Sequence, residues 1–154
     1  MLLSYREGHG KVYLLPTKKK LLSIKKGAVL RDNMTNEFSE KDVGRNILMK
    51  NYSTFHIGGS AQRFICVSTP DAVISAIQYA NKERMPFFIL GGGSNILFSD
   101  EGVQGLVIRI IGNSIERDGD IITASAGTSL GSAVAFARVN ALAGLEWAAG
   151  IPGT

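Results

Sequence analysis

From residue 51 onward, the apolar positions predict a strand, a helix and a second strand in succession. The runs RFICVS at 63–68 and FFIL at 87–90 are apolar and rich in β-branched or aromatic residues, which is typical of strands. The stretch 69–85 has helical spacing, with Thr69 suited to the N-cap and Pro70 to the first turn. Its apolar stripe comprises Val73, Ile77 and Ala80. A glycine-rich loop therefore follows the carboxyl end of the second strand, where open α/β sheets favour ligands.

The second half of the chain predicts further strands and one more helix. Residues 105–111, GLVIRII, have the composition of a buried strand. Residues 114–125 predict a β-hairpin, because Asp118–Gly119 is a turn signal between β-branched residues. A helix is expected to begin at a cap formed by Thr128 or by the serine that follows it, and to end near Gly144. Strands and helices in this order predict the α+β class.

Residues 1–46 are polar, mixed in charge and weakly periodic, so we expect a basic N-terminal extension with one short helix. The first fifty residues hold eleven Lys or Arg against five Asp or Glu, whereas the rest holds six against eight. The lysines gather at 18–20 and 25–26 without interleaved aromatic residues, which is typical of a solvated face. Nucleic acid is not expected as a partner, and nucleic-acid binding stays an alternative that rests on these lysines alone.

Two absences narrow the class of protein. No apolar stretch approaches the roughly 20 residues that a membrane-crossing helix needs, and the N-terminus lacks the apolar core of a signal peptide. We therefore expect a cytoplasmic protein without a membrane partner. The single cysteine, Cys66, excludes an internal disulfide and a thiolate metal cluster, so no metal site is expected. Because Cys66 lies in an apolar run, we expect it to be buried as a small hydrophobic residue.

The loop GGGSN at 91–95 is the strongest candidate for a binding site. A P-loop would need a lysine after its second glycine, and a dinucleotide-binding G-x-G-x-x-G would need a glycine in place of Ile96. The remaining readings are a tight turn and a strand–loop–strand nest, in which successive backbone N–H groups bind an anion such as phosphate. Three consecutive glycines are more than a turn requires, which favours the nest.

Three blocks of the sequence, in this order and spacing, resemble one family of flavoenzymes. They are NYSTFHIGGSAQRF, PFFILGGGSNILFSDEGVQGLVIRI and ASAGTSLGSAVAFARVNALAGLEWAAGIPGT. Over about residues 47–154 the chain is similar to UDP-N-acetylmuramate dehydrogenases, also called UDP-N-acetylenolpyruvoylglucosamine reductases. The resemblance implies a p-cresol methylhydroxylase-type FAD-binding domain. Its first subdomain would occupy 47–105, and the beginning of an incomplete second subdomain would occupy 106–154.

The resemblance also implies a cofactor, a reaction and a set of binding residues. In the family, FAD passes hydride from NADPH to the enolpyruvyl group of UDP-N-acetylenolpyruvoylglucosamine, which yields UDP-N-acetylmuramate for peptidoglycan synthesis. The glycine loop would hold the FAD diphosphate, and three other glycine-bearing segments would approach the rest of the cofactor. The cofactor-binding residues implied in this way are Thr54, Ile57, Gly58, Gly91, Gly92, Gly93, Ser94, Asn95, Gly127, Thr128, Gly150, Ile151 and Gly153.

The catalytic residues of the family lie downstream of its Ile-Pro-Gly-Thr block, and the present sequence ends within that block at Thr154. No catalytic residue is therefore assigned, and we expect a truncated N-terminal part that is inactive alone. NADPH and the UDP-sugar would be partners of the full-length parent. We expect His56, Asp100 and Glu146 to be structural. Another FAD-dependent oxidoreductase of the same fold and a non-catalytic nucleotide-binding module stay open as alternatives.

Overall fold

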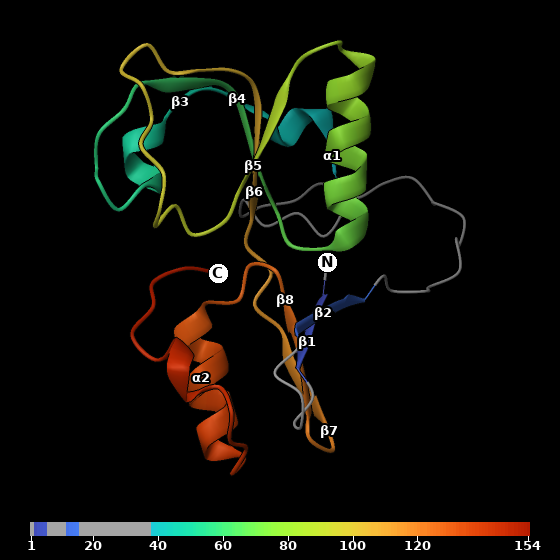
Figure 1. Cartoon of the computed structure of the whole chain (residues 1–154). Helices are drawn as coiled ribbons and strands as arrows, with labels where there is room; N and C mark the ends of the chain where they lie inside the picture. The colour runs from blue at the N-terminus through green and yellow to red at the C-terminus, as the bar shows by residue number, and fades with distance from the viewer. Residues whose placement is uncertain (1, 6–11, 16–37) are drawn as a thin grey trace.

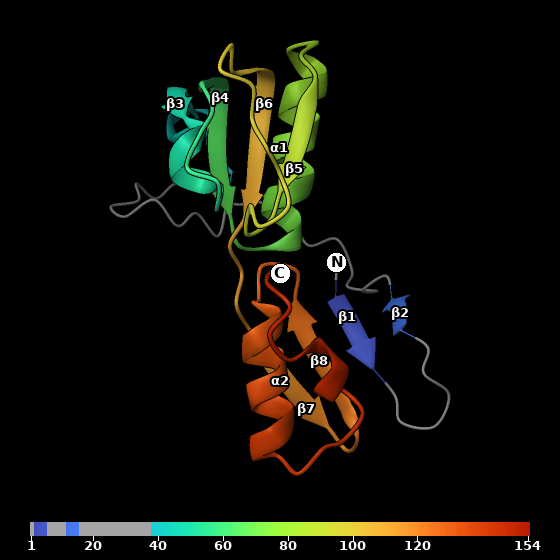
Figure 2. The same cartoon turned by 60° about the vertical axis from the view of Figure 1, so that its left-hand side comes forward.

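The structure, a computed structural model, describes residues 2–5, 12–15 and 38–154 and is a mixed α/β fold. Within these residues the strands form two four-stranded sheets, with the orders β3-β4-β6-β5 and β2-β1-β8-β7. The sheets lie one above the other, and the C-terminal residue is placed between them in both views (Figures 1 and 2). A ligand between the two sheets would therefore be within reach of the last residues of the chain.

The first sheet is built around the two strands at its centre, β4 (Ser60–Val67) and β6 (Val103–Ile110). These run parallel, β5 (Phe87–Leu90) adds to β6 in parallel, and β3 (Gly44–Leu48) adds to β4 in the antiparallel direction. The strands predicted at 63–68, 87–90 and 105–111 are thus confirmed, with small differences at their ends. Because β6 has a partner on each side, both of its backbone edges are hydrogen-bonded.

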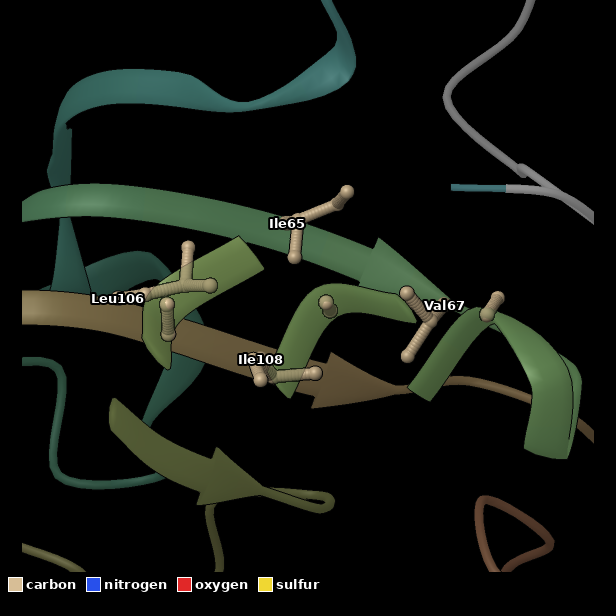
Figure 3. Close-up of a cluster of buried hydrophobic side chains, with 7 residues drawn as sticks. Ile65, Val67, Leu106 and Ile108 are labelled. Atoms are coloured by element: carbon tan, nitrogen blue, oxygen red, sulfur yellow. The ribbon is translucent and has the colours of Figure 1, made fainter. Parts of the chain in front are cut away.

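Helix α1 (Pro70–Lys82) covers one face of this sheet and begins as the sequence predicts. The Ala72 N–H donates a hydrogen bond of 3.2 Å to the Thr69 hydroxyl, which is the expected N-cap. The buried stripe differs from the prediction, because alanines meet the sheet while Val73 and Ile77 pack at its margin. Small residues let the helix approach the strand side chains closely. This core consists of Ile65, Val67, Ala72, Ala76, Ala80, Leu106 and Ile108 (Figure 3).

The other face of the first sheet has a core of its own, which carries the candidate site. It is covered by the 3-10 helix η2 (Met49–Tyr52) and by the irregular segment 96–99. Residues 96–99 form no regular structure, so the glycine loop is not followed directly by the second strand of a strand–loop–strand nest. The buried residues on this face are Met49, Ala61, Phe64, Leu90, Phe98 and Val107.

The second sheet contains the predicted hairpin, β7 (Ile115–Asp118) with β8 (Ile121–Ser125). Asp118 pairs with Ile121, so the two turn residues are Gly119 and Asp120, one position later than predicted. Helix α2 (Leu130–Val139) follows, and its N-cap is Ser129, whose hydroxyl accepts the Ser132 N–H at 3.0 Å. The helix ends at Val139, well before the predicted stop at Gly144. The chain then closes with the 3-10 helix η3 (Glu146–Ala148).

The beginning of the chain differs most from its prediction. We expected a loosely attached extension, but the described residues of this part form the strands β1 (Leu2–Tyr5) and β2 (Val12–Leu15), and β1 pairs with β8. Residues 6–11 and 16–37, where a short helix was also expected, lie outside the described residues. A 3-10 helix, η1 (Glu40–Asp42), precedes β3, which begins at Gly44. The boundaries predicted at 46/47 and 105/106 therefore lie inside β3 and β6. The lysines at 18–20 and 25–26 lie outside the described residues.

Two properties of the described residues bear on the class of protein. No helix there combines the length and the apolar character that crossing a membrane requires. In the same residues, His, Cys, Asp and Glu side chains form no group of three or more that would hold a metal ion.

Candidate functional site

The glycine loop at 91–95 leaves the carboxyl end of β5 and is held in place by the segment that follows η2. The Thr54 N–H donates to the Gly93 carbonyl at 3.1 Å, and the Thr54 hydroxyl donates to the Ser94 carbonyl at 3.3 Å. One residue earlier, the Ser53 hydroxyl donates to the Ile96 carbonyl at 2.9 Å. Because these donors belong to a neighbouring segment, the loop has a defined shape without a helix or strand after it.

The three glycines of the loop have different surroundings. Gly93 is buried with φ +74°, and a Cβ there would overlap the Tyr52 carbonyl oxygen. At Gly91 and Gly92, by contrast, an added Cβ would meet no backbone, and its neighbours would be side-chain atoms of Thr154 and Ser94. The Gly92 N–H donates to the Thr154 hydroxyl at 3.2 Å. Gly93 is therefore required by packing, whereas Gly91 and Gly92 form an edge that faces the end of the chain.

A hollow of about 340 Å³ lies beside this edge of the loop. Its lining comes from η2 and the residues after it, from the glycine loop and from the end of β6. Among the described residues, no Asp or Glu belongs to the lining, and Arg109 supplies a positive charge. Such a hollow suits a neutral or anionic ligand. The lining residues are Asn51, Tyr52, Ser53, Thr54, His56, Gly92 and Arg109.

Arg109 is the chemically distinctive member of this lining. Its guanidinium carbon lies 5.1 Å from the centroid of the Tyr52 ring, which is a cation–π distance. Its Nε is buried and has no hydrogen-bond partner among the described residues. In the register of the sheet, Arg109 is the partner of Cys66 on β4. Burial raises the pKa of the Cys66 thiol, and the nearby Arg109 charge offsets part of that rise. Cys66 is half-buried and packs against the core of this face, so the expected burial as a small hydrophobic residue is met in part.

The predicted site residues at the start of α2 are engaged in local packing. A Cβ at Gly127 would lie 2.6 Å from the Gly112 carbonyl oxygen, so the two backbones cross closely there. The buried Thr128 hydroxyl lies 3.0 Å from the Ser125 hydroxyl and donates to the Ser114 carbonyl at 3.2 Å. Neither residue lines the hollow, and both hold the junction between the second sheet and α2.

Two further predicted residues, Ile57 and Gly58, lie on the segment that enters β4. Gly58 has φ +121°, and a Cβ there would lie 2.5 Å from the Phe98 side chain. This contact supports the irregular segment that follows the glycine loop. Ile57 is 52% exposed, which leaves an apolar side chain available at the surface. Neither residue lines the hollow.

The C-terminal segment joins the second part of the molecule to the glycine loop. The Gly153 carbonyl accepts a hydrogen bond of 2.9 Å from the Leu130 N–H at the start of α2, and the next residue, Thr154, reaches Gly92. Gly150 has φ +82° and Gly153 has φ +145°, and a Cβ at either position would meet nothing within 4 Å. Ile151 between them is exposed at 45%. The segment therefore offers open backbone on the side of the first sheet's glycine loop.

The structure brings some of the predicted residues together and leaves others apart. Thr54 and Gly92 line the hollow, and the rest of the glycine loop adjoins it. Sequence reasoning missed most of the lining, including Tyr52 and Arg109, and it treated His56 as structural although it lines the hollow. One signal was available for Arg109, since it is the only charged residue in the apolar run GLVIRII.

The comparison with protein families assigns this architecture to a class. The model of the FAD-binding domain family matches residues 61–154, and the chain belongs to that family. Within it, the chain is homologous to the FAD-binding region of UDP-N-acetylenolpyruvoylglucosamine reductases, which confirms the resemblance noted in the sequence.

Individual relatives support this relationship over most of the chain. The reductase of Caldanaerobacter subterraneus subsp. tengcongensis is 37% identical over 127 residues, which are 82% of this chain and 42% of that protein. The reductase of Clostridium novyi is 37% identical over 75% of this chain and 38% of its own length. The crystal structure of UDP-N-acetylenolpyruvylglucosamine reductase from Thermus caldophilus superposes with a TM-score of 0.61 at 35% identity, covering 72% of this chain and 38% of that one. The chain thus spans about two fifths of the length of these relatives.

Proposed function

We propose that the chain binds FAD and forms the FAD-binding region of an NADPH-dependent reductase. The reductase would convert UDP-N-acetylenolpyruvoylglucosamine to UDP-N-acetylmuramate in peptidoglycan synthesis. Bound FAD would supply the capacity to accept and donate hydride, while the protein binds and orients it. The homology to reductases of this kind supports the proposal, and the fold would be of the p-cresol methylhydroxylase type with two subdomains.

The observation that carries the proposal is the open edge at Gly91 and Gly92. A diphosphate needs N–H donors that it can approach closely, and these two residues present backbone with no neighbouring main chain in the space of a Cβ. The edge lies at the carboxyl end of β5, which is parallel to β6, the usual position for a ligand in such sheets. The acceptor of the Gly92 N–H is the hydroxyl of the exposed Thr154, which a phosphate oxygen could replace.

The hollow fits part of a dinucleotide. At about 340 Å³ it has the size of a small ligand pocket, and its lining combines aromatic, hydroxyl and cationic groups. We propose that Gly91, Gly92, Ser94 and Asn95 bind the diphosphate, and that Thr54 lies beside it. The remaining implied residues would shape the site or contact the cofactor from the second part of the molecule; these are Ile57, Gly58, Gly93, Gly127, Thr128, Gly150, Ile151 and Gly153.

A matched pair of glycine variants tests this proposal. Gly92→Ala adds a methyl group to the open edge, and Gly131→Ala makes the same change on α2, where a Cβ meets nothing within 4 Å. In titrations followed by flavin fluorescence, we expect Gly92→Ala to weaken FAD binding by about tenfold or more, which is 1.4 kcal/mol. Gly131→Ala should bind as the unmodified chain does. Equal affinity in all three chains, or no binding of FAD by the unmodified chain, would contradict the proposal.

The way in which the flavin is attached to the protein distinguishes the proposal from one of its alternatives. A covalently attached flavin would favour the alternative, another FAD-dependent oxidoreductase of the same fold. The proposal predicts noncovalent binding, so denaturing the protein should release all of the bound flavin.

We also propose that these 154 residues alone do not complete the reductase reaction, because they correspond to about two fifths of the length of the relatives. Oxidation of NADPH by the FAD-loaded chain, followed by absorbance with the UDP-sugar present, should stay at the rate of free FAD.

A further inference from the structure

Arg109 is the only charged residue of β6, and it is held in a defined orientation at the hollow. Its guanidinium lies over the ring of Tyr52, and this ring packs in turn on Phe64 with the centroids 4.4 Å apart. Phe64 belongs to the buried core on this face of the sheet. The guanidinium therefore rests on an aromatic ring that is itself packed against the core of this face.

The positive charge of Arg109 has no counter-ion among the residues that the structure describes. Within them, no Asp or Glu forms an ion pair with it, and its buried Nε lacks an acceptor. The Cys66 thiol next to it does not supply a negative charge, because burial raises its pKa. A partly buried guanidinium without a counter-ion is unfavourable, and an anion in the hollow would be attracted to its charge.

A second donor opens onto the same hollow from the glycine loop. The Gly92 N–H is directed at the hydroxyl of Thr154, an exposed residue at the end of the chain. Both Gly92 and Arg109 line the hollow, so an anion that replaced the Thr154 hydroxyl there would find a backbone amide and a guanidinium together. Arginine and backbone N–H groups are the donors that proteins use most often for phosphate oxygens.

We propose that Arg109 binds a phosphate oxygen of the FAD diphosphate and supplies the charge that the glycine loop lacks. The identity of the ligand rests on the proposed function, whereas the anion site rests on the surroundings of Arg109. Arg109 thereby becomes the residue that selects flavins carrying a diphosphate. The place of Arg109 in the lining, its lack of an ion pair and the absence of acidic side chains from the lining, all judged over the described residues, carry this assignment.

Substitutions at Arg109 test the proposal through binding alone. Arg109→Met keeps the apolar bulk on Tyr52 and removes the charge, and Arg109→Lys keeps the charge. Arg138→Gln, on the exposed last turn of α2, is the control for a change in net charge. We expect Arg109→Met to weaken FAD binding by about tenfold to a hundredfold, the range for a hydrogen bond to a charged group. Arg109→Lys should lose less, and Arg138→Gln should lose nothing.

Cys66 provides a second readout that needs no flavin. The Arg109 charge lowers the pKa of the thiol, so an anion bound to Arg109 makes the thiolate scarcer and slows its alkylation by iodoacetamide. Inorganic pyrophosphate should therefore slow alkylation of Cys66 in the unmodified chain and in Arg138→Gln. It should leave the rate unchanged in Arg109→Met. Circular dichroism of each variant establishes that it is folded.

The outcomes separate this inference from the proposed function. If FAD does not bind but pyrophosphate slows alkylation only when Arg109 is present, the anion site stands and the identity of the cofactor is wrong. If FAD binds to Arg109→Met as tightly as to the unmodified chain, the inference is overturned while the proposed function stands. If Arg109→Lys and Arg109→Met lose equal affinity and pyrophosphate has no effect, Arg109 is a packing residue and the inference is also overturned.

Discussion

The difference between Gly93 and Gly92 leads to a prediction about stability. A methyl group at Gly93 would meet the Tyr52 carbonyl oxygen, and the backbone there has φ +74°. A left-handed conformation costs a residue other than glycine about 1–2 kcal/mol, and forcing a group into packed structure costs about 1–3 kcal/mol. Gly93→Ala should therefore lower the free energy of unfolding by roughly 2–5 kcal/mol. Gly92 has no positive φ, and its Cβ would lie 3.3 Å from the Thr154 methyl, so Gly92→Ala should change stability by less than about 0.5 kcal/mol.

Urea unfolding followed by circular dichroism measures this contrast. With a slope of about 1–3 kcal/mol per molar urea for a small protein, Gly93→Ala should move the midpoint by roughly 0.7 M or more. The midpoint of Gly92→Ala should stay close to that of the unmodified chain. The experiment is done without flavin, because a ligand stabilises the state that binds it and would mix the two effects. Equal midpoints for the two variants would refute the reasoning, because a methyl group would then cost the same at the packed Gly93 as at the open Gly92.

Two further predictions concern the first sheet and the helix that covers it. Thr69→Ala removes the acceptor of the Ala72 N–H at the start of α1 and should lower the free energy of unfolding by about 1 kcal/mol. An unchanged midpoint in urea unfolding would mean that the cap contributes nothing. Burial raises the pKa of the Cys66 thiol in the folded chain, so the folded state keeps its proton to higher pH than the unfolded state. Compared with Cys66→Ala, the unmodified chain should keep its full free energy of unfolding below the ordinary thiol pKa and lose part of it as the pH rises through the thiol pKa of the folded chain. Parallel pH profiles of the two chains would contradict this.

Local signals account for the parts of the fold that the sequence predicted well. The cap at Thr69, the proline after it and the apolar periodicity all lie within a few turns of α1, and they locate its beginning to the residue. The hairpin of β7 and β8 is local as well, and its turn was misplaced by one position. Such features depend on contacts close in sequence, so a single sequence contains the information needed to find them.

The features that the sequence did not predict depend on contacts between distant residues. β1 pairs with β8 across more than a hundred positions, and nothing in a four-residue run indicates such a partner. The glycine loop was recognised, but the different surroundings of its glycines depend on Tyr52 and Thr154, which approach it only in the folded chain. Arg109 was not identified from the sequence, because its place over Tyr52 depends on the packing of η2 on the sheet.

The distribution of charged residues along the chain explains why the composition did not indicate an anion site in its second part. The excess of basic residues lies in the first fifty residues, while the remainder, which contains the site, carries more acidic than basic side chains. Exposed charges lose most of their effect beyond the Debye length of about 8 Å at physiological salt. A partly buried guanidinium such as Arg109 is screened much less, because the medium around it is less polarisable than water. One arginine over an aromatic ring therefore sets the local preference for an anion in a part of the chain whose net charge is negative. Raising the salt concentration should accordingly weaken the effect of pyrophosphate on Cys66 only modestly.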